Sequence, residues 1–361
     1  MKTTASMFTG GGLFDMGAIA AGYTHIWGIE WDDKIAAVAR SNGLNVSTAD
    51  VTKVDFSMLE RPDHLHASPP CPNFSIAKAN AEETEFDMAM ADAVCRAVDT
   101  LMPDTFTLEN VVGYRKSESF KRITSRLAAL GYFWDAANLN SADFGVPQTR
   151  RRLFIRASRT GLLRQYPSAK PWVGWYSAIE DLIDTLPDTE FAPWQVARLP
   201  EEYKTFLIGQ GTYSSPRNTD EPADTITGNN NQTGVKAFIL AGAGNTNLAE
   251  AEPGRGVRYE EEPAHTVAAG SGGRIPKAFV VGGGSAGKNI LVADGNEPFF
   301  TIKANAGANG FPRSSIGRVV KMTIQALGRF QTVPDTYKGL TTKINGNGVP
   351  CLMAQRVMET L

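Results

Sequence analysis

The sequence predicts a doubly wound α/β domain together with a smaller domain made mostly of strands and loops. Over the first 160 residues, short apolar runs alternate with segments in which apolar residues recur at helical spacing. This alternation is typical of a parallel sheet whose strands are joined by crossover helices. After about Tyr166, Pro, Gly and Asn become dense and long helical periodicity disappears, so a second domain is expected there. A chain of 361 residues, 42% of them hydrophobic, can bury one large core and a smaller one.

The elements of the first domain follow from the apolar runs and their spacing. Strands are expected at residues 6–8, 25–30, 64–67, 105–109 and 153–157. Helices are expected at residues 14–21, 33–41, 83–102 and 117–130, and Gly131 ends the last one. From about Val319, helical periodicity resumes and continues to Leu361.

Two short motifs recur in the second domain. Glu-Pro-Ala-Asp-Thr-Ile at 221–226 returns as Glu-Pro-Ala-His-Thr-Val at 262–267 and, more weakly, as Glu-Pro-Phe-Phe-Thr-Ile at 297–302. Lys-Ala-Phe-Ile-Leu at 236–240 returns as Lys-Ala-Phe-Val-Val at 277–281. Both fuller copies are 41 residues apart (262 − 221 and 277 − 236). We therefore expect a repeated unit of a strand and a glycine-rich loop, with a short β-meander that has no binding role as the alternative.

Charge and cysteine content narrow the class of protein. The net charge of −2 does not indicate a globally basic surface, so any nucleic-acid site must be local. Three cysteines, Cys71, Cys95 and Cys351, form neither a Cys-x-x-Cys motif nor an even disulfide framework, which favours a reducing compartment. The start of the sequence does not resemble a signal peptide, and no run of about 18 apolar residues occurs. We expect a cytoplasmic protein without a membrane segment.

A glycine-rich loop follows the first predicted strand. Phe-Thr-Gly-Gly-Gly at 8–12 lies between that strand and a helix, where glycines let the backbone pass close to a ligand. The next strand ends in Glu30, the usual place for a carboxylate that holds ribose hydroxyls. Trp31 could lie against an adenine ring, and Asp50 could accept from the adenine amino group. The alternatives are a tight turn for the loop and solvated strand-end carboxylates for the two acids.

Cys71 is the one cysteine in an unusual setting. It follows the predicted strand at 64–67, within Ser-Pro-Pro-Cys-Pro-Asn-Phe-Ser at 68–75, and three prolines restrict the backbone around it. The carboxyl end of a strand is where α/β folds place ligands. A buried, inert thiol is the ordinary alternative, and Cys95 and Cys351 are interpreted in that way.

Polar groups are expected at the same sheet edge. Glu109 ends the apolar strand at 105–109, and the alternative for it is a solvated or capping role. In Gln-Thr-Arg-Arg-Arg at 148–152, an extended backbone would turn Gln148, Arg150 and Arg152 to one side. Such a group suits phosphate and carbonyl oxygens, although a solvated guard of an edge strand is equally consistent with the pattern.

Taken in this order, the segments resemble the cytosine carbon-5 methyltransferase family. The resemblance covers both ends of the chain and rests on the cofactor loop, the Pro-Pro-Cys loop, the Glu-Asn-Val segment, the Gln-x-Arg-x-Arg pattern and two C-terminal motifs. These lie at residues 8–12, 68–75, 109–111, 148–152, 329–334 and 346–350. The chain departs from the family's common residues at Ser6, Leu13, Pro72 and Ala326, changes that concern the donor pocket more than the reaction.

The resemblance implies a reaction and the residues for it. Carbon 5 of cytosine is a poor nucleophile, so a thiolate first adds to carbon 6 while an acid protonates ring nitrogen 3. Cys71 would be the nucleophile, Glu109 the acid, Arg152 a contact to the cytosine oxygen and Arg150 a support for the closed loop. The methyl donor would be S-adenosyl-L-methionine, and no metal is expected. Its site would comprise Phe8, Thr9, Gly10, Gly12, Glu30, Trp31, Asp50, Pro70, Asn347 and Val349.

The resemblance also implies the domain layout and the partners. Residues 1–160 with 318–361 would form a Rossmann-like methyltransferase domain in which the C-terminal helix packs back beside the first strand, and residues 161–317 would form the target-recognition domain. The substrate would be duplex DNA with the target base flipped out. We expect a monomer, and a cognate restriction endonuclease that forms no stable complex is an allowed partner.

Other functions were weighed against this one. An amino-methylating enzyme would have an aromatic residue where Cys71 stands, and a tRNA cytosine methyltransferase would have a more compact recognition region. A non-catalytic DNA-binding relative is disfavoured by the joint presence of Cys71, Glu109 and Arg152. A Rossmann oxidoreductase would need the full glycine spacing and a hydride-transfer site, neither of which the sequence contains.

Overall fold

A computed structural model describes most of the chain and divides it into two compact units. The described residues are 1–70, 83–161, 163–189, 191, 205–209, 214–226, 234–240, 278–282, 291–292 and 313–361. Unit 1 comprises Met1–Glu180, Asp220–Asn231 and Ile324–Leu361. Unit 2 comprises Asp181–Thr219 and Gln232–Thr323.

Unit 1 is built on a mixed sheet of seven strands in the order β3-β2-β1-β4-β5-β7-β6. The strands are β1 (Thr3–Met7), β2 (Thr24–Glu30), β3 (Val46–Thr48), β4 (His64–Ala67), β5 (Thr105–Asn110), β6 (Phe133–Asn140) and β7 (Arg151–Ser158). β1 to β5 pair in parallel, whereas β7 runs antiparallel to both β5 and β6. The predicted doubly wound α/β fold is confirmed.

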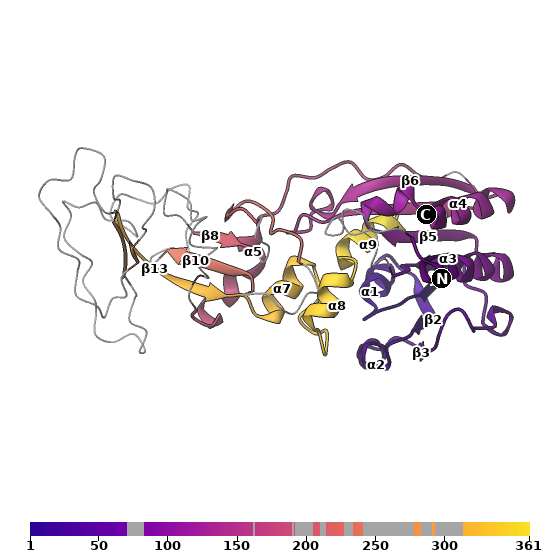
Figure 1. The fold of residues 1–361 in the computed structure, drawn as a ribbon, viewed down its shortest axis with the longest axis horizontal. Helices are drawn as coiled ribbons and strands as arrows, with labels where there is room; N and C mark the ends of the chain where they lie inside the picture. Colours follow the sequence, from indigo (N-terminus) through magenta and orange to yellow (C-terminus); the bar gives the residue numbers. More distant parts are fainter. Residues whose placement is uncertain are drawn as a thin grey trace, which may run out of the picture. The chain divides into compact units, whose positions relative to one another are not determined.

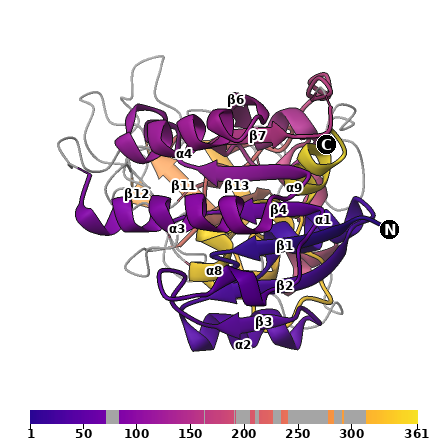
Figure 2. The ribbon, with the colours of Figure 1, turned by 90° about the vertical axis from the view of Figure 1, so that its right-hand side faces the viewer.

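Helices cover both faces of this sheet. The helices of unit 1 are α1 (Leu13–Ala20), α2 (Asp33–Ser41), α3 (Glu85–Leu101), α4 (Glu118–Ala129), α5 (Trp175–Ile179), α7 (Ile324–Phe330), α8 (Thr342–Asn347) and α9 (Cys351–Met358). Short 3-10 helices occur at Phe56–Met58, Val112–Lys116, Ser141–Phe144 and Glu180–Thr185. In Figures 1 and 2, α3 and α4 lie together on one face, and α1 and α9 lie on the other. No helix among the described residues is long and apolar enough to span a bilayer.

Local sequence explains where the helices begin. Asp32 accepts from the backbone N–H groups of Lys34 and Ile35, which caps α2. Thr84 and Asp87 form a reciprocal capping box at the start of α3. The predicted helix at 33–41 therefore has the observed bounds, and the predicted helix at 83–102 begins two residues later in the structure, at Glu85.

Two apolar layers hold the sheet between its helices. One layer joins the central strands to α3 and α4, with Leu65, Val94 and Phe106 fully or almost fully buried. The other joins α1 to α9, and here Gly17 lies against the Cys351 carbonyl so closely that a side chain would collide with it. The C-terminal helix thus packs on α1, and the expectation that it lies beside the first strand is refined accordingly.

Unit 2 contains a separate antiparallel sheet in the order β12-β11-β13-β10-β8-β9. Its strands are β8 (Phe206–Ile208), β9 (Arg217–Asn218), β10 (Lys236–Leu240), β11 (Ala278–Gly282), β12 (Leu291–Val292) and β13 (Arg313–Lys321). The two copies of the Lys-Ala-Phe motif supply β10 and β11, which pair with β13 on opposite sides. The expectation that this motif forms a repeated strand is confirmed, whereas the copies at 262–267 and 297–302 lie outside the described residues.

The structure corrects two sequence predictions. Val319 and Val320 do not begin a helix, because they belong to β13, and helical structure starts at Ile324. Valine is β-branched and packs well on a pleated sheet, and here Val319 pairs with Phe238 of β10. The strands β3 and β6 were missed: β3 has three residues, and β6 at the sheet edge is too exposed and polar to form an apolar run.

Candidate active site

The loops that carry the predicted site residues meet at one edge of the sheet. β1, β4 and β5 are parallel neighbours, so their carboxyl ends bring together the loops after Met7, Ala67 and Asn110. Cys71 lies outside the described residues, and the described part of its loop ends at Pro70, which is exposed. Asn110 Nδ2 donates to the Pro69 carbonyl at 3.2 Å, so β5 holds the start of the cysteine loop.

Glu109 is held from two sides. Its carboxylate Oε1 lies 3.0 Å from Nε of Arg152, and Oε2 accepts from the Ser68 hydroxyl at 3.3 Å. The residue is only 6% exposed. Glu109 is therefore neither a solvated strand end nor a helix cap: it is a buried carboxylate with a fixed orientation, one strand away from the cysteine loop.

Residues 148–152 alternate as an extended segment should. Gln148 and Arg150 are buried, Arg152 is partly buried and Arg151 is exposed. Arg150 donates to the Gly346 carbonyl at 2.9 Å, and burial lowers its pKa well below the ordinary value, helped by the charge of Arg152. This segment is therefore more than a solvated edge guard, because Arg150, just before β7, binds the last turn of α8, where the C-terminal Gly-Asn-x-Val-Pro motif begins.

Gln148 has an unusual environment. It is fully buried, and among the described residues its side-chain amide nitrogen and oxygen have no hydrogen-bond partner. Its backbone is bound instead: the Gln148 carbonyl accepts from the Ser141 hydroxyl at 2.6 Å. A buried amide without partners is costly, so its retention here favours a functional role over a purely structural one.

The glycine loop and Glu30 form the other half of the edge. Glu30 Oε2 accepts from the Gly10 N–H at 2.8 Å, and Oε1 accepts from the Asp32 N–H at 2.9 Å. The carboxylate therefore links the loop after β1 to the loop after β2. Phe8 has a φ of 59°, which is rare for a residue with a side chain and marks a constrained turn as the chain leaves β1.

Glycine at position 11 lets the backbone of this loop lie close to the C-terminal segment. A Cβ on Gly11 would meet Ile344, and would lie 2.6 Å from Oη of Tyr337. The same hydroxyl donates to the Gly11 carbonyl at 2.6 Å. At Gly10, with a φ of 58°, the space around an added Cβ is open. The loop is thus packed on one side against the C-terminal segment and free on the other.

The remaining predicted donor residues fall into three environments. Trp31 is 66% exposed and Asn347 is also exposed, so both side chains are accessible. Asp50 follows β3 and accepts from the backbone and hydroxyl of Thr52 at 3.0 and 2.7 Å. Thr9, Gly12 and Val349 are buried: the Thr9 hydroxyl donates to Ser6 and Ile29 carbonyls, Gly12 caps α1, and Val349 packs in the layer between α1 and α9.

Two positions that depart from the family's common residues are also placed. Ser6 is buried and shares a hydrogen bond of 2.9 Å with Thr9. Leu13 is buried against Tyr337 and Ile344. Both residues therefore support the glycine loop from its buried side.

Sequence reasoning missed a group of polar residues beneath the site. His64 and His66 of β4 and Thr105 and Thr107 of β5 are all buried and hydrogen-bonded to one another. The available signal was the alternation of polar residues in two strands that were predicted to be buried. The other two cysteines behave as predicted, since burial raises the pKa of Cys95 to about 11 and that of Cys351 to about 12, which leaves inert thiols.

The sheet order and the loops at its carboxyl edge define a methyltransferase fold. The structure of a methyltransferase from Entamoeba histolytica is similar with a TM-score of 0.57 at 13% sequence identity, covering 100% of this chain and 97% of that one. A family model described as C-5 cytosine-specific DNA methylase matches residues 2–361. The chain belongs to this family.

Curated relatives agree with that assignment. The type II methyltransferase M1.BsuMI of Bacillus subtilis is 34% identical over 137 residues, which are 36% of this chain and 32% of that protein. The type II methyltransferase M.AgeI of Thalassovita gelatinovora is 24% identical over 99% of this chain and 98% of its own length. In four other comparisons of this kind the chain spans between 48% and 62% of the curated relative.

Proposed function

We propose that this protein transfers a methyl group from S-adenosylmethionine to carbon 5 of cytosine in duplex DNA, through a covalent adduct with Cys71. The observation that supports it most is the position of Glu109, a buried carboxylate fixed between Arg152 and Ser68 beside the start of the cysteine loop. Addition to a cytosine ring requires an acid and a thiol, and Cys71 follows in sequence the strand that neighbours the one carrying Glu109.

In the proposed reaction the thiolate of Cys71 adds to carbon 6, and protonated Glu109 gives its proton to ring nitrogen 3. The electron pair of the former double bond then makes carbon 5 nucleophilic. S-adenosylmethionine supplies the methyl group when bound. Water takes the proton from carbon 5, the thiolate departs as the ring double bond re-forms, and Glu109 recovers its proton from nitrogen 3.

Arg152 and Arg150 have different tasks in this proposal. The Arg152 guanidinium pairs with Glu109 through Nε, which leaves other N–H groups for the cytosine oxygen. Arg150 is buried and donates from Nη1 to the Gly346 carbonyl, and so acts on the site by holding the C-terminal motif in position. A flipped base is proposed because ring nitrogen 3 and carbon 6 are inaccessible in a stacked duplex.

The donor fits the glycine-loop half of the edge. Gly10 has open space on one side, Trp31 presents an exposed indole, and the carboxylates of Glu30 and Asp50 follow neighbouring strands. These groups could contact adenosine and its ribose, with Phe8, Pro70 and Asn347 around them. Backbone anchoring already occupies one lone pair on each Glu30 oxygen, and each oxygen has a second to offer.

One experiment tests the reaction and its substrate. The protein is expressed in a host that lacks cytosine methylation, and host DNA and tRNA are digested separately to nucleosides and weighed by mass spectrometry. We expect 5-methylcytosine in DNA only, and none with Cys71→Ala, which should fold normally because one thiol is removed from a loop. Methylation of tRNA alone, or full turnover by Cys71→Ala, would overturn the proposal.

We further propose that residues 161–317 read the DNA sequence, and that the protein acts as a monomer without a stable endonuclease partner. The support for sequence reading is the separate sheet of unit 2, which includes two copies of a repeated strand motif. Exchanging residues 221–317 for the same region of another family member should change the sequence that is methylated, as measured by base-resolution sequencing. An unchanged site would show that residues 221–317 do not read the sequence.

A further inference from the structure

A line of buried polar side chains runs along β4 and β5, from the amino ends of these strands to their carboxyl ends. β4 and β5 pair in parallel, with His64 opposite Thr105 and His66 opposite Thr107. Since alternate residues of a strand share a face, these four side chains lie on one face of the sheet. Together with two residues at the carboxyl edge they form what we call the buried polar chain. Its members, in order, are Thr105, His64, Thr107, His66, Ser68 and Glu109.

The first part of the chain is continuous. Thr105 Oγ1 lies 2.9 Å from Nδ1 of His64. Nε2 of His64 lies 3.0 Å from Oγ1 of Thr107, which in turn lies 2.8 Å from Nδ1 of His66. Each imidazole thus uses both ring nitrogens, and the Thr107 hydroxyl bridges the two rings. His64 and Thr107 are fully buried, and His66 is 2% exposed.

The second part reaches the acid of the proposed site. Nε2 of His66 lies 2.9 Å from the Ser68 hydroxyl, which donates to Oε2 of Glu109 at 3.3 Å. Because the single hydroxyl proton of Ser68 points to the carboxylate, His66 must donate from Nε2 and accept at Nδ1. The same reasoning makes Thr107 the donor to His66 and His64 the donor to Thr107. All donors therefore point toward Glu109.

The surroundings keep both imidazoles neutral. Burial lowers the pKa of His64 to about 3, with the positive charge of Lys2 as a second cause, and lowers that of His66 well below its ordinary value. The Phe14 ring stacks on His66 with centroids 3.4 Å apart and planes 5° apart. A neutral imidazole with a partner on each nitrogen can accept a proton on one and release one from the other without becoming charged at rest.

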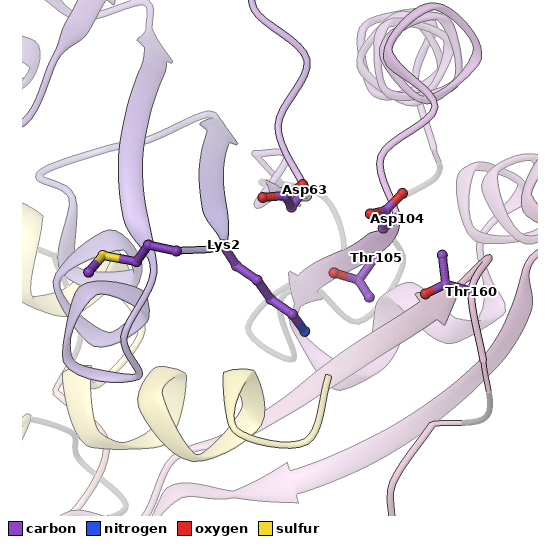
Figure 3. A pocket seen from close by; sticks show the side chains of 6 residues that line it. Lys2, Asp63, Asp104, Thr105 and Thr160 are labelled. Carbon is purple, nitrogen blue, oxygen red and sulfur yellow. The ribbon is translucent and has the colours of Figure 1, made fainter.

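The far end of the chain opens on a cavity. Thr105 lies at the amino end of β5 and lines a space of about 270 Å³ together with Lys2, Asp63, Asp104 and Thr160 (Figure 3). This is the edge of the sheet opposite to Glu109, because the strands here are parallel. Lys2 is exposed, so the cavity is in contact with solvent. Its carboxylates and ammonium group are suited to exchange protons with water.

We propose that the buried polar chain conducts protons between this cavity and Glu109, loading the acid before it protonates cytosine and unloading it after turnover. The proposal rests on the proposed function of Glu109. Glu109 contacts Arg152 and is nearly inaccessible even without DNA. A cytosine bound at the site would reduce the access of water to Glu109 further. The buried polar chain approaches Glu109 from the opposite side, which the base does not cover.

The transfer balances at every link. To load Glu109, the Ser68 proton passes to Oε2 and the Nε2 proton of His66 passes to Ser68. The Thr107 proton then moves to Nδ1 of His66, the Nε2 proton of His64 moves to Thr107, and the Thr105 proton moves to Nδ1 of His64. Water in the cavity returns a proton to Thr105. One proton enters, one reaches the carboxylate, and each imidazole changes tautomer. Unloading reverses every link, so loading and unloading alternate without a separate reset.

Thr107 is the best position at which to interrupt the buried polar chain, since Thr107→Val removes the bridging hydroxyl and keeps the side-chain shape. Thr107→Ser keeps the hydroxyl. Thr4→Val is a matched control: Thr4 is fully buried on β1, pairs with His64 in register, and its hydroxyl has no partner among the described residues. Ser68→Ala cuts the chain at a second link.

The test measures single-turnover methylation of DNA at saturating donor and DNA, in mixtures of H2O and D2O. We expect Thr107→Val and Ser68→Ala to be slower than wild type by at least about tenfold, with unchanged Kd for DNA and donor, and Thr107→Ser and Thr4→Val to be within about twofold. A plot of the wild-type rate against the fraction of D2O should be curved, because several protons move in the same step. The same plot should be linear for Thr107→Val and Ser68→Ala.

The outcomes separate the two proposals. If wild type makes 5-methylcytosine but Thr107→Val matches Thr4→Val in rate and isotope dependence, proton conduction is wrong and the proposed function stands. If Thr107→Val and Ser68→Ala are slower but their rates still depend on the D2O fraction along a curve, the buried polar chain has only a structural role. If wild type makes no 5-methylcytosine in DNA, the proposed function fails and the role of the chain fails with it. Should Thr107→Val not fold, Ser68→Ala decides.

Discussion

The two halves of the carboxyl edge are built by different means. In the chemical half, after β4 and β5, side chains hold one another: Glu109 is positioned by Arg152 and Ser68, and Ser68 by His66. In the donor half, after β1 and β2, the backbone does most of the positioning. There Glu30 binds two backbone N–H groups, and Gly11 packs directly against the C-terminal segment.

This difference determines which changes each half tolerates. The chemical half should be sensitive to the loss of a single polar atom even when shape is preserved, because a buried group left without its partner is costly. The donor half should be sensitive to added volume at Gly11 and Gly12, because a Cβ at either position would collide with a neighbouring side chain. Three predictions test this contrast, beginning with the largest effect.

Glu109→Gln should reduce the rate of methylation by about 100-fold or more while DNA binding is retained. Glutamine keeps the size and can still accept from Ser68, but it has no acidic proton to give to the cytosine ring. The measurement is single-turnover methylation alongside a DNA-binding titration. Glu118→Gln is the control, since that carboxylate is exposed and, in the described part of the chain, pairs with Lys121 on the helix surface. If Glu109→Gln methylated DNA at the wild-type rate, Glu109 would not be the acid of the reaction.

Acid should destabilise the protein through its buried histidines. Burial lowers the pKa of His64 to about 3 and that of His25 to about 4, and lowers that of His66 as well. Between these values and about 6.5 the unfolded chain binds more protons than the folded one, so the free energy of unfolding falls as pH falls. Asp15 acts in the opposite sense, since burial raises its pKa to about 7.

With three groups against one, we expect a net loss of about 3 kcal/mol from about pH 7 to about pH 5. Thermal unfolding at the two pH values measures it. His64→Asn, which retains hydrogen-bonding groups but does not titrate, should show a smaller loss over the same range. An unfolding midpoint that does not change with pH would mean that these histidines are already hydrated in the folded protein.

Gly11→Ala should raise the KM for S-adenosylmethionine by about tenfold and change kcat little. The new methyl group would meet Ile344 and the Tyr337 hydroxyl, so the loop must shift away from the C-terminal segment. Gly161→Ala is the control, because that glycine has no left-handed φ and nothing lies within 4 Å of an added Cβ. Equal KM values for the two variants would show that the donor half has more room than its packing indicates.

Much of this architecture could be predicted from local sequence. The strand at His64–Ala67 and the helix at Asp33–Ser41 have the predicted bounds, because alternation and helical spacing are signals carried by nearby residues. The end of β13 was misread, since a short valine pair is compatible with either element until its pairing partner is known. The role of Glu109 was named from its motif, but its contacts with Ser68 and Arg152 were not predictable from spacing.

The sequence by itself determined the fold class, the family and the order of the site motifs, because these depend on residue types at short separations. The tertiary structure alone decided that Glu109 ends a line of hydrogen bonds that starts at Thr105 on the opposite edge of the sheet. That line depends on the parallel register of β4 and β5, which sets His64 beside Thr105 and His66 beside Thr107. Register is a property of two strands together, and about 40 residues of intervening chain separate them.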